Sequence, residues 1–235
     1  MLAYADFFIV FQILTALFVG AILWFSVRAY RLTNMSFLIA FFLGFLLLES
    51  SFTFVMINRL VGHTGILYHG TFWIQEILQT AAFAFIASAY YFKNKELTNG
   101  RMATYAIAMI IIIAISVIAF LSTPPTFAFA WRTLTSPYFY LVNLALLSYA
   151  VYRVATTTTT SLSSSNKRPV RVRTLVVPAG FAILALSQIL WIYWGFTDLN
   201  DVLVIANGFY VTGLALLASA LLMILRRRLS YAEVH

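Results

Sequence analysis

The sequence predicts an all-α polytopic membrane protein with seven transmembrane helices, its N-terminus outside the cell and its C-terminus in the cytoplasm. Of the 235 residues, 63% are apolar and only 9% are charged. Soluble domains carry about 25% charged residues, so these charges are too few to cover a surface that faces water. The apolar residues also gather into stretches of about 20 residues, the length of helix that crosses a bilayer.

The apolar stretches define one membrane domain that spans residues 1–235. The predicted helices cover 7–27, 36–57, 71–92, 102–121, 137–153, 174–195 and 202–225. No basic residue precedes the first stretch, and no cleavage site of small residues follows it. We therefore interpret it as a retained helix and not as a signal peptide.

The basic residues fix the predicted orientation. The loops on one side, together with the C-terminal tail, carry 13 lysines and arginines, whereas the other side carries Arg59 and Arg132 only. Cytoplasmic loops are enriched in basic residues, so the basic side is predicted to face the cytoplasm. The predicted location is the plasma membrane. The net charge of +8 then needs no nucleic-acid partner. Tryptophans near the predicted outer ends indicate an interfacial belt: Trp73, Trp131, Trp191 and Trp194.

Two halves of the chain, 7–92 and 137–225, share a pattern that predicts an internal repeat around the linking helix 102–121. Gly44, Phe45, Leu48 and Ser51 recur at the same spacing as Gly180, Phe181, Leu184 and Ser187. Both halves start outside, so they form a parallel 3+1+3 repeat, which is one established transporter architecture. The alternative is that Ala, Leu, Phe and Ser recur in any set of membrane helices.

This three-plus-one-plus-three layout resembles that of the SWEET sugar transporters, over the whole chain but in topology alone. That family carries a proline–glutamine motif and prolines in four helices. Here the helices 7–27 and 36–57 contain no proline, and Pro178 is not followed by glutamine. The resemblance therefore implies an analogous arrangement of helices and nothing more specific.

The sequence predicts a protein without a cofactor, neither retinal nor haem. The seven-helix, N-outside layout also resembles that of microbial rhodopsins, but a retinal Schiff base needs a lysine. The only lysines, Lys93, Lys95 and Lys167, lie in predicted loops. No pair of histidines lies within a span to hold haem, and the absence of cysteine excludes thiolate metal sites and cysteine nucleophiles.

Acidic and amide side chains within the predicted spans are the candidate substrate or ion ligands, because a charge inside a bilayer is costly and usually functional. Glu49 lies about 20 Å past Ser36 along its helix, and Glu76 about 7 Å from the outer end of the next. Gln188 and Asn207 are predicted at similar depth. The remaining candidates are Gln79, Ser51 and Ser187. The alternative is that these groups join helices, at about 0.6 kcal/mol per hydrogen bond, or that Glu76 reaches up to the headgroups.

Two other features have weaker interpretations. His63 and His69, in the loop between the second and third helices, are candidate metal ligands, although solvated loop histidines are the commoner case. The tract from Thr156 to Ser165 is predicted to be a flexible linker.

We expect a small-solute or ion transporter or channel with its polar site in the outer half of the bundle. The competing class is a non-transporting sensor or an accessory subunit, which would report to a membrane or cytoplasmic partner protein. Enzymatic activity ranks third, because no hydrolase, kinase or phosphate-binding motif appears. The expected partners are the lipid bilayer and a small solute or ion, and no nucleic acid.

Overall fold

The computed structural model describes residues 2–33, 37–61, 66–91, 136–163, 168–197 and 199–232, with scattered helical positions between 100 and 114. Each of these continuous ranges forms a helix, the last of them after Leu199, and no strand occurs in them. The helices are α1 (Leu2–Thr33), α2 (Phe37–Val61), α3 (Ile66–Tyr91), α6 (Ser136–Ser163), α7 (Arg168–Thr197) and α8 (Asn200–Ala232). The predicted linking helix 102–121 lies largely outside the described residues.

Four of the described helices contain segments that are long and apolar enough to cross a membrane: Phe7–Leu32, Pro137–Thr156, Leu175–Thr197 and Asn200–Met223. The described apolar part of α2, Phe37–Thr53, is shorter. These four segments agree with the corresponding predicted spans, and α1, α6, α7 and α8 each extend past the predicted span at both ends. The all-helical prediction is thus confirmed for the described residues.

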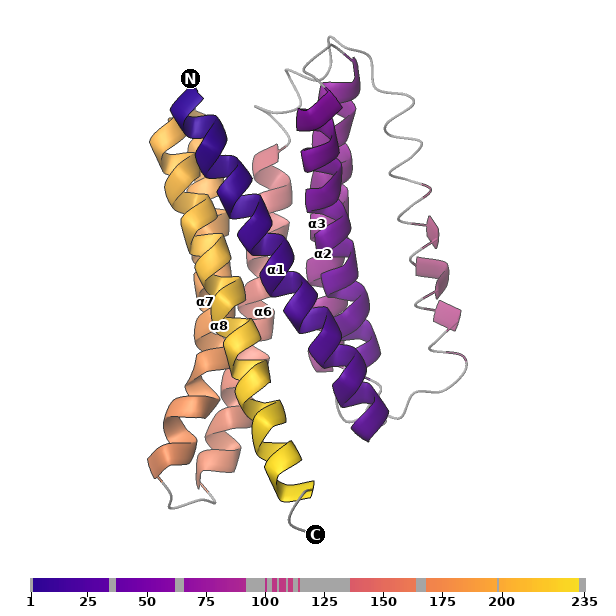
Figure 1. Cartoon of the computed structure of the whole chain (residues 1–235), viewed down its shortest axis with the longest axis vertical. Coiled ribbons are helices and arrows are strands. Elements are labelled where there is room, and N and C mark those ends of the chain that lie inside the picture. Colours follow the sequence, from indigo (N-terminus) through magenta and orange to yellow (C-terminus); the bar gives the residue numbers. More distant parts are fainter. Residues whose placement is uncertain are drawn as a thin grey trace.

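The six described helices pack as a closed ring, in the order α1, α2, α3, α6, α7, α8 and back to α1. Figure 1 shows α1 leaning across the bundle from α8, at the end where the chain begins, towards α2 and α3 at the other end. We call the end at which α1 begins the upper end, as it is drawn in Figure 1. Helices α3, α6 and α8 also begin there, whereas α2 and α7 end there.

Glycines bring two helix pairs into close contact. A Cβ atom built on Gly44 of α2 would lie 2.8 Å from the backbone oxygen of Ala82 in α3, and one built on Gly213 of α8 would lie 2.9 Å from the backbone oxygen of Gly180 in α7. Small residues at membrane-helix interfaces permit such approach. The α2–α3 and α7–α8 pairs are therefore held by backbone-to-backbone packing.

The predicted flexible linker is wrong as far as Ser163, because α6 continues through the Thr/Ser tract to that residue. The Thr156 hydroxyl donates a hydrogen bond to the Arg153 backbone oxygen at 3.1 Å. Such back-bonding lets a threonine remain helical, and extending an existing helix costs far less than nucleating a new one.

The lower end of the bundle carries the basic side chains that the structure describes: Arg28, Arg31 and Arg153. The Arg28 guanidinium lies over the exposed ring of Trp24, 5.3 Å from its centroid. A tryptophan beside an arginine at a helix end is typical of the membrane–water interface.

Candidate functional site

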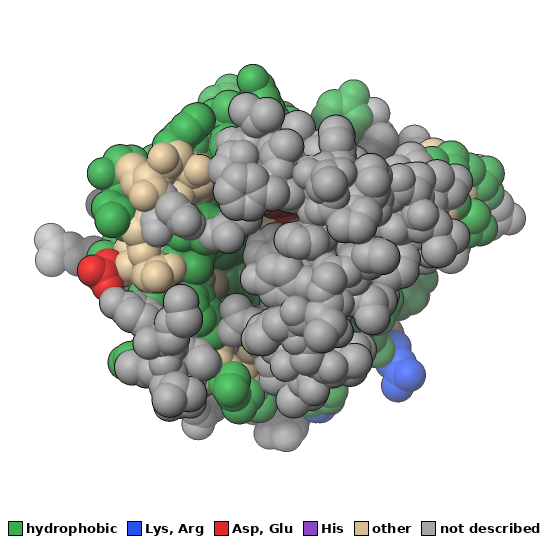
Figure 2. Space-filling view, turned by 90° about the horizontal axis from the view of Figure 1, so that it is seen from above, with side chains coloured by type: hydrophobic (Ala, Val, Ile, Leu, Met, Phe, Trp, Pro, Cys, Tyr) green, Lys and Arg blue, Asp and Glu red, His purple; other side chains and the backbone are tan. Residues whose placement is uncertain are grey.

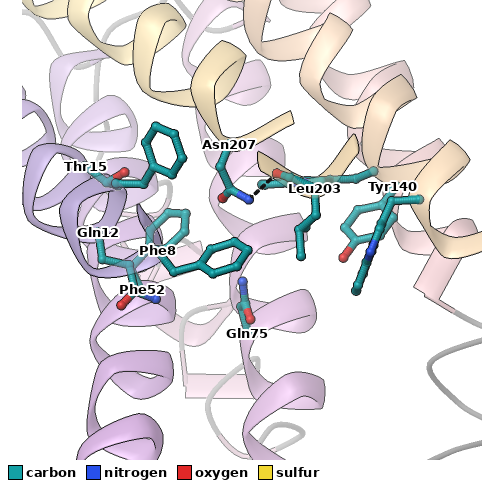
Figure 3. A pocket seen from close by; sticks show the side chains of 11 residues that line it. Phe8, Gln12, Thr15, Phe52, Gln75, Tyr140, Leu203 and Asn207 are labelled. Carbon is teal, nitrogen blue, oxygen red and sulfur yellow. Dashed lines mark hydrogen bonds between the residues drawn. The ribbon is translucent and has the colours of Figure 1, made fainter. Parts of the chain in front are cut away.

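A cavity opens between the helices in the upper part of the bundle. All six described helices contribute to its wall, and its volume is about 80 Å³. The lining is Phe8, Phe11, Gln12, Thr15, Phe52, Gln75, Tyr140, Trp191, Trp194, Leu203 and Asn207. Figure 3 shows Gln12, Gln75 and Asn207 entering this space from α1, α3 and α8. Since one water occupies about 30 Å³ in the liquid, the cavity has room for a few water-sized groups.

A layer of polar side chains lies one helical turn below the cavity. Each member is three or four residues from a lining residue on its own helix, which places it on the same face about 5 Å deeper. We call this layer the polar floor; its members are Glu49, Gln79, Asn143, Gln188 and Tyr210. Gln79, Asn143, Gln188 and Tyr210 are at most 1% exposed, and Glu49 is partly buried.

The polar floor is incompletely hydrogen-bonded. Asn143 donates through Nδ2 to Oε1 of Gln188 at 3.3 Å, which joins α6 to α7. Tyr210 lies beside Gln79 and within electrostatic reach of Glu49, but its hydroxyl makes no hydrogen bond of good geometry. Both polar atoms of Gln79 and Oε2 of Glu49 also have no hydrogen-bond partner among the described residues. Most buried polar groups in proteins are paired, so these buried atoms without a partner are an unusual feature of the bundle.

A packed apolar layer closes the bundle below the floor. One further turn down each helix lie the fully buried side chains of Phe45, Phe83, Leu147, Leu184 and Leu214. Lower still, the Tyr90 ring of α3 meets the Phe181 ring of α7 edge-on, with 5.6 Å between centroids. The cavity is therefore separated from the lower end of the bundle by continuous apolar packing.

The electrostatics of the site are set by acidic side chains. The described basic side chains nearest to the cavity along a helix are Arg28 and Arg153, which lie about 20 Å by helical rise beyond the lining residues Thr15 and Tyr140. Figure 2 views the upper end from above and shows part of an acidic side chain at the bottom of a gap near the centre of this face. Among the described residues, no group of three or more His, Cys, Asp or Glu side chains could hold a metal ion.

The predicted site residues occupy two depths. Asn207 lines the cavity and donates its Nδ2 to the backbone oxygen of Leu203 at 2.7 Å. Glu76 is 2% exposed and directly follows the lining residue Gln75. Glu49 and Gln188 lie in the polar floor, one turn below.

The two predicted serines are buried, but each hydroxyl hydrogen bonds within its own helix. Ser51 donates to the Leu48 backbone oxygen and Ser187 to that of Leu184, both at 2.7 Å. Neither serine lines the cavity. The side chains of His63 and His69 lie outside the described part of the chain, so their proposed metal site stays a prediction.

Sequence reasoning overlooked part of the site. Gln12, Asn143 and Tyr210 were not predicted, although the depth estimate applied to Gln188 would have found Asn143 on the neighbouring helix. Trp191 and Trp194 lie near the end of α7, as predicted, but their side chains are 4% and 5% exposed and do not form the predicted interfacial belt. They project from α7 on the face that carries Gln188 and Ser187, and therefore point into the bundle.

Comparison of the chain with known protein families, with curated proteins and with solved structures finds no match.

Proposed function

We propose that this protein is a multi-pass carrier of a small solute, with seven transmembrane helices and its N-terminus outside the cell. The cavity in the upper part of the bundle, which lies between the six described helices and is sealed from the lower end by apolar packing, carries the proposal. A solute site accessible from one side at a time is the requirement for alternating access.

An arrangement of two parallel three-helix repeats supports this function. Helices α2 and α3 pack as α7 and α8 do, and the α1–α8 contact has its counterpart in the α6–α3 contact. Gly44 packs against Ala82 and Ile86, while its repeat counterpart Gly180 packs against Gly213 and Leu217, which hold the equivalent places in α8. A pseudo-twofold axis through the ring would place the cavity between the repeats, where transporters bind substrate.

The charge distribution supports the orientation. The arginines described at the lower end, with the further basic residues of the predicted cytoplasmic loops, favour a cytoplasmic lower end. The cavity then lies in the outer half of the membrane, and the apolar packing below it closes the described conformation on the cytoplasmic side. Rocking of the two repeats would part the contact between Tyr90 and Phe181 and open the cavity to the cytoplasm.

Solute flux through the purified protein in liposomes tests the proposal. The panel should contain amines, amino acids, sugars and monovalent ions, each measured as concentration-dependent uptake above empty liposomes. Leu203→Trp fills the cavity from α8 and should abolish uptake of the transported solute. Leu199→Trp is the matched control, because Leu199 is 52% exposed and does not line the cavity.

Equal uptake by the two tryptophan variants would refute the cavity as the pathway. Uptake of no solute at all, in protein that still binds a ligand in the cavity, would instead favour a sensor that reports to a partner protein.

A further inference from the structure

The cavity lining brings together three amide side chains from three helices. Gln12 of α1, Gln75 of α3 and Asn207 of α8 all line this space, and Figure 3 shows their amide groups around it. These residues are far apart in the sequence, so only the packing of the bundle brings them to one cavity. An amide carries both hydrogen-bond donors and an acceptor, so the lining can exchange hydrogen bonds of both kinds with one small ligand.

The orientation of the Asn207 amide is fixed within its own helix. Its Nδ2 donates to the backbone oxygen of Leu203 at 2.7 Å. That oxygen can only accept a hydrogen bond, so the amide nitrogen must face it and Oδ1 must point away. Figure 3 shows Oδ1 on the side of Asn207 opposite to this hydrogen bond. Asn207 therefore offers an acceptor to the cavity, and a ligand that matches it must carry a donor.

The amides of Gln12 and Gln75 are not engaged by the other described side chains of the lining. The hydrogen bond of Asn207 is the only one that Figure 3 marks among the lining residues it draws. Both glutamines are partly buried, and the terminal torsion of a glutamine amide has a broad, twofold energy profile. Each amide can therefore turn its N–H groups towards an acceptor. A ligand that carries a donor and an acceptor together matches all three amides.

The remaining lining is mostly apolar, with Phe8, Phe11, Phe52 and Leu203 among its members. Such a wall favours a ligand with a short alkyl part beside its polar group. None of the described lining residues carries a charge, and transferring a charged ligand from water into such a lining is costly. The volume of about 80 Å³ holds about three water-sized groups at about 30 Å³ each. The best-fitting ligand is thus neutral, with about four non-hydrogen atoms.

We propose that the cavity binds a small neutral primary amide, which carries the group –CO–NH₂ and a short alkyl part. Its nitrogen donates to Oδ1 of Asn207, its carbonyl oxygen accepts from Gln75 or Gln12, and its alkyl part lies among the phenylalanine rings. Acetamide has this group and the fitting size. This inference rests on the carrier function proposed above and names its substrate class.

Binding to the purified full-length protein tests the proposal separately from transport. Acetamide is the probe, and intrinsic fluorescence is the readout because Trp191 and Trp194 line the cavity. Acetone has the same shape and carbonyl group but no N–H donor, and acetate has the same shape with a negative charge. A ligand of about four non-hydrogen atoms binds no tighter than on the order of tens of micromolar, so the titrations cover the micromolar to millimolar range. We expect saturable binding of acetamide and at least about tenfold weaker binding of acetone and acetate, since both leave the Asn207 acceptor without a donor.

Two variants of matched chemistry locate the site on α8. Asn207→Leu keeps the size of the side chain and removes the acceptor, so it should weaken acetamide binding by about tenfold and abolish the preference over acetone. Asn200→Leu removes an exposed amide of the same helix that does not line the cavity, and it should change acetamide binding by less than about twofold. A purely structural role of Asn207 would leave the preference over acetone unchanged.

A third variant tests the opposite wall of the cavity. Gln75→Met keeps the length of the side chain and removes its amide. It should weaken the binding of acetamide and acetone by similar factors, because both ligands offer the carbonyl oxygen that the Gln75 amide binds. The preference for acetamide should therefore persist in Gln75→Met and disappear in Asn207→Leu.

Equal binding of acetamide and acetone, or a preference for acetamide that Asn207→Leu leaves unchanged, would overturn the proposal. Flux of acetamide into liposomes is measured alongside that of the other solutes. Transport of another solute by protein that does not bind acetamide would overturn the amide site and leave the carrier function standing. Saturable acetamide binding without flux of any solute would retain the site and refute the carrier function.

Discussion

Alanine at Gly44 is expected to push α2 away from α3, whereas alanine at Gly20 should be harmless. The added Cβ at position 44 would lie 2.8 Å from the Ala82 backbone oxygen and 3.2 Å from the Ile86 backbone nitrogen. Ordinary contacts begin near 3.4 Å, and backbone atoms of a packed helix cannot rotate aside. The helices must therefore separate by about half an ångström. The same addition at Gly20 meets no atom within 4 Å.

The two substitutions share one favourable term and differ in one unfavourable term. Alanine is preferred to glycine in a helix by about 1 kcal/mol, and this gain applies at both positions. Overpacking a close contact costs about 1–3 kcal/mol, and it applies to Gly44 only. At about 2–4 °C per kcal/mol for a protein of this size, Gly44→Ala should unfold roughly 2–12 °C below Gly20→Ala.

The unfolding temperature can be followed by intrinsic tryptophan fluorescence in detergent, since the chain contains five tryptophans and no cysteine for a thiol-reactive dye. Gly180→Ala should behave as Gly44→Ala does, because its Cβ would lie 2.9 Å from two Leu217 atoms and 3.2 Å from the Gly213 backbone oxygen. Equal unfolding temperatures for the Gly44 and Gly20 variants would refute the close packing of α2 on α3.

Four further predictions concern the site and the orientation. The Glu49→Gln variant should fold normally and lose the cation or pH dependence of flux. If its stability and its flux both stay close to those of the unaltered protein, Glu49 has a purely structural role. Asn143→Ala should destabilise the protein by about 1–3 kcal/mol by leaving Gln188 without its buried donor, measured by the same thermal unfolding; an unchanged stability would contradict the Asn143–Gln188 bond. A cysteine at Ser163 should resist an impermeant thiol reagent in intact cells, and ready labelling would reverse the proposed orientation. The purified protein should show no visible absorption band after stringent washing, because no lysine or histidine pair in the predicted spans can hold a chromophore or haem.

Part of the candidate site could be reached by counting residues along the helices. Glu49, Glu76, Gln188 and Asn207 were selected because a polar group within an apolar stretch is costly in lipid. Counting gives the depth of a residue to within a turn, and it does not give the direction of a side chain around its helix. It therefore could not separate Asn207, which lines the cavity, from Gln188, which lies in the floor.

The sequence by itself determined the helical class and the approximate spans, because the lengths and polarity of its apolar stretches leave helices as the way to satisfy backbone hydrogen bonds in lipid. It also determined the charge asymmetry between the two ends. Only the tertiary structure decided which faces meet. Trp191 and Trp194 turn inwards because of how α7 packs, and the polar floor forms because five helices bring single polar residues to one level. Such alignment depends on the rotation and offset of each helix against its neighbours, which long-range packing fixes and local sequence does not encode.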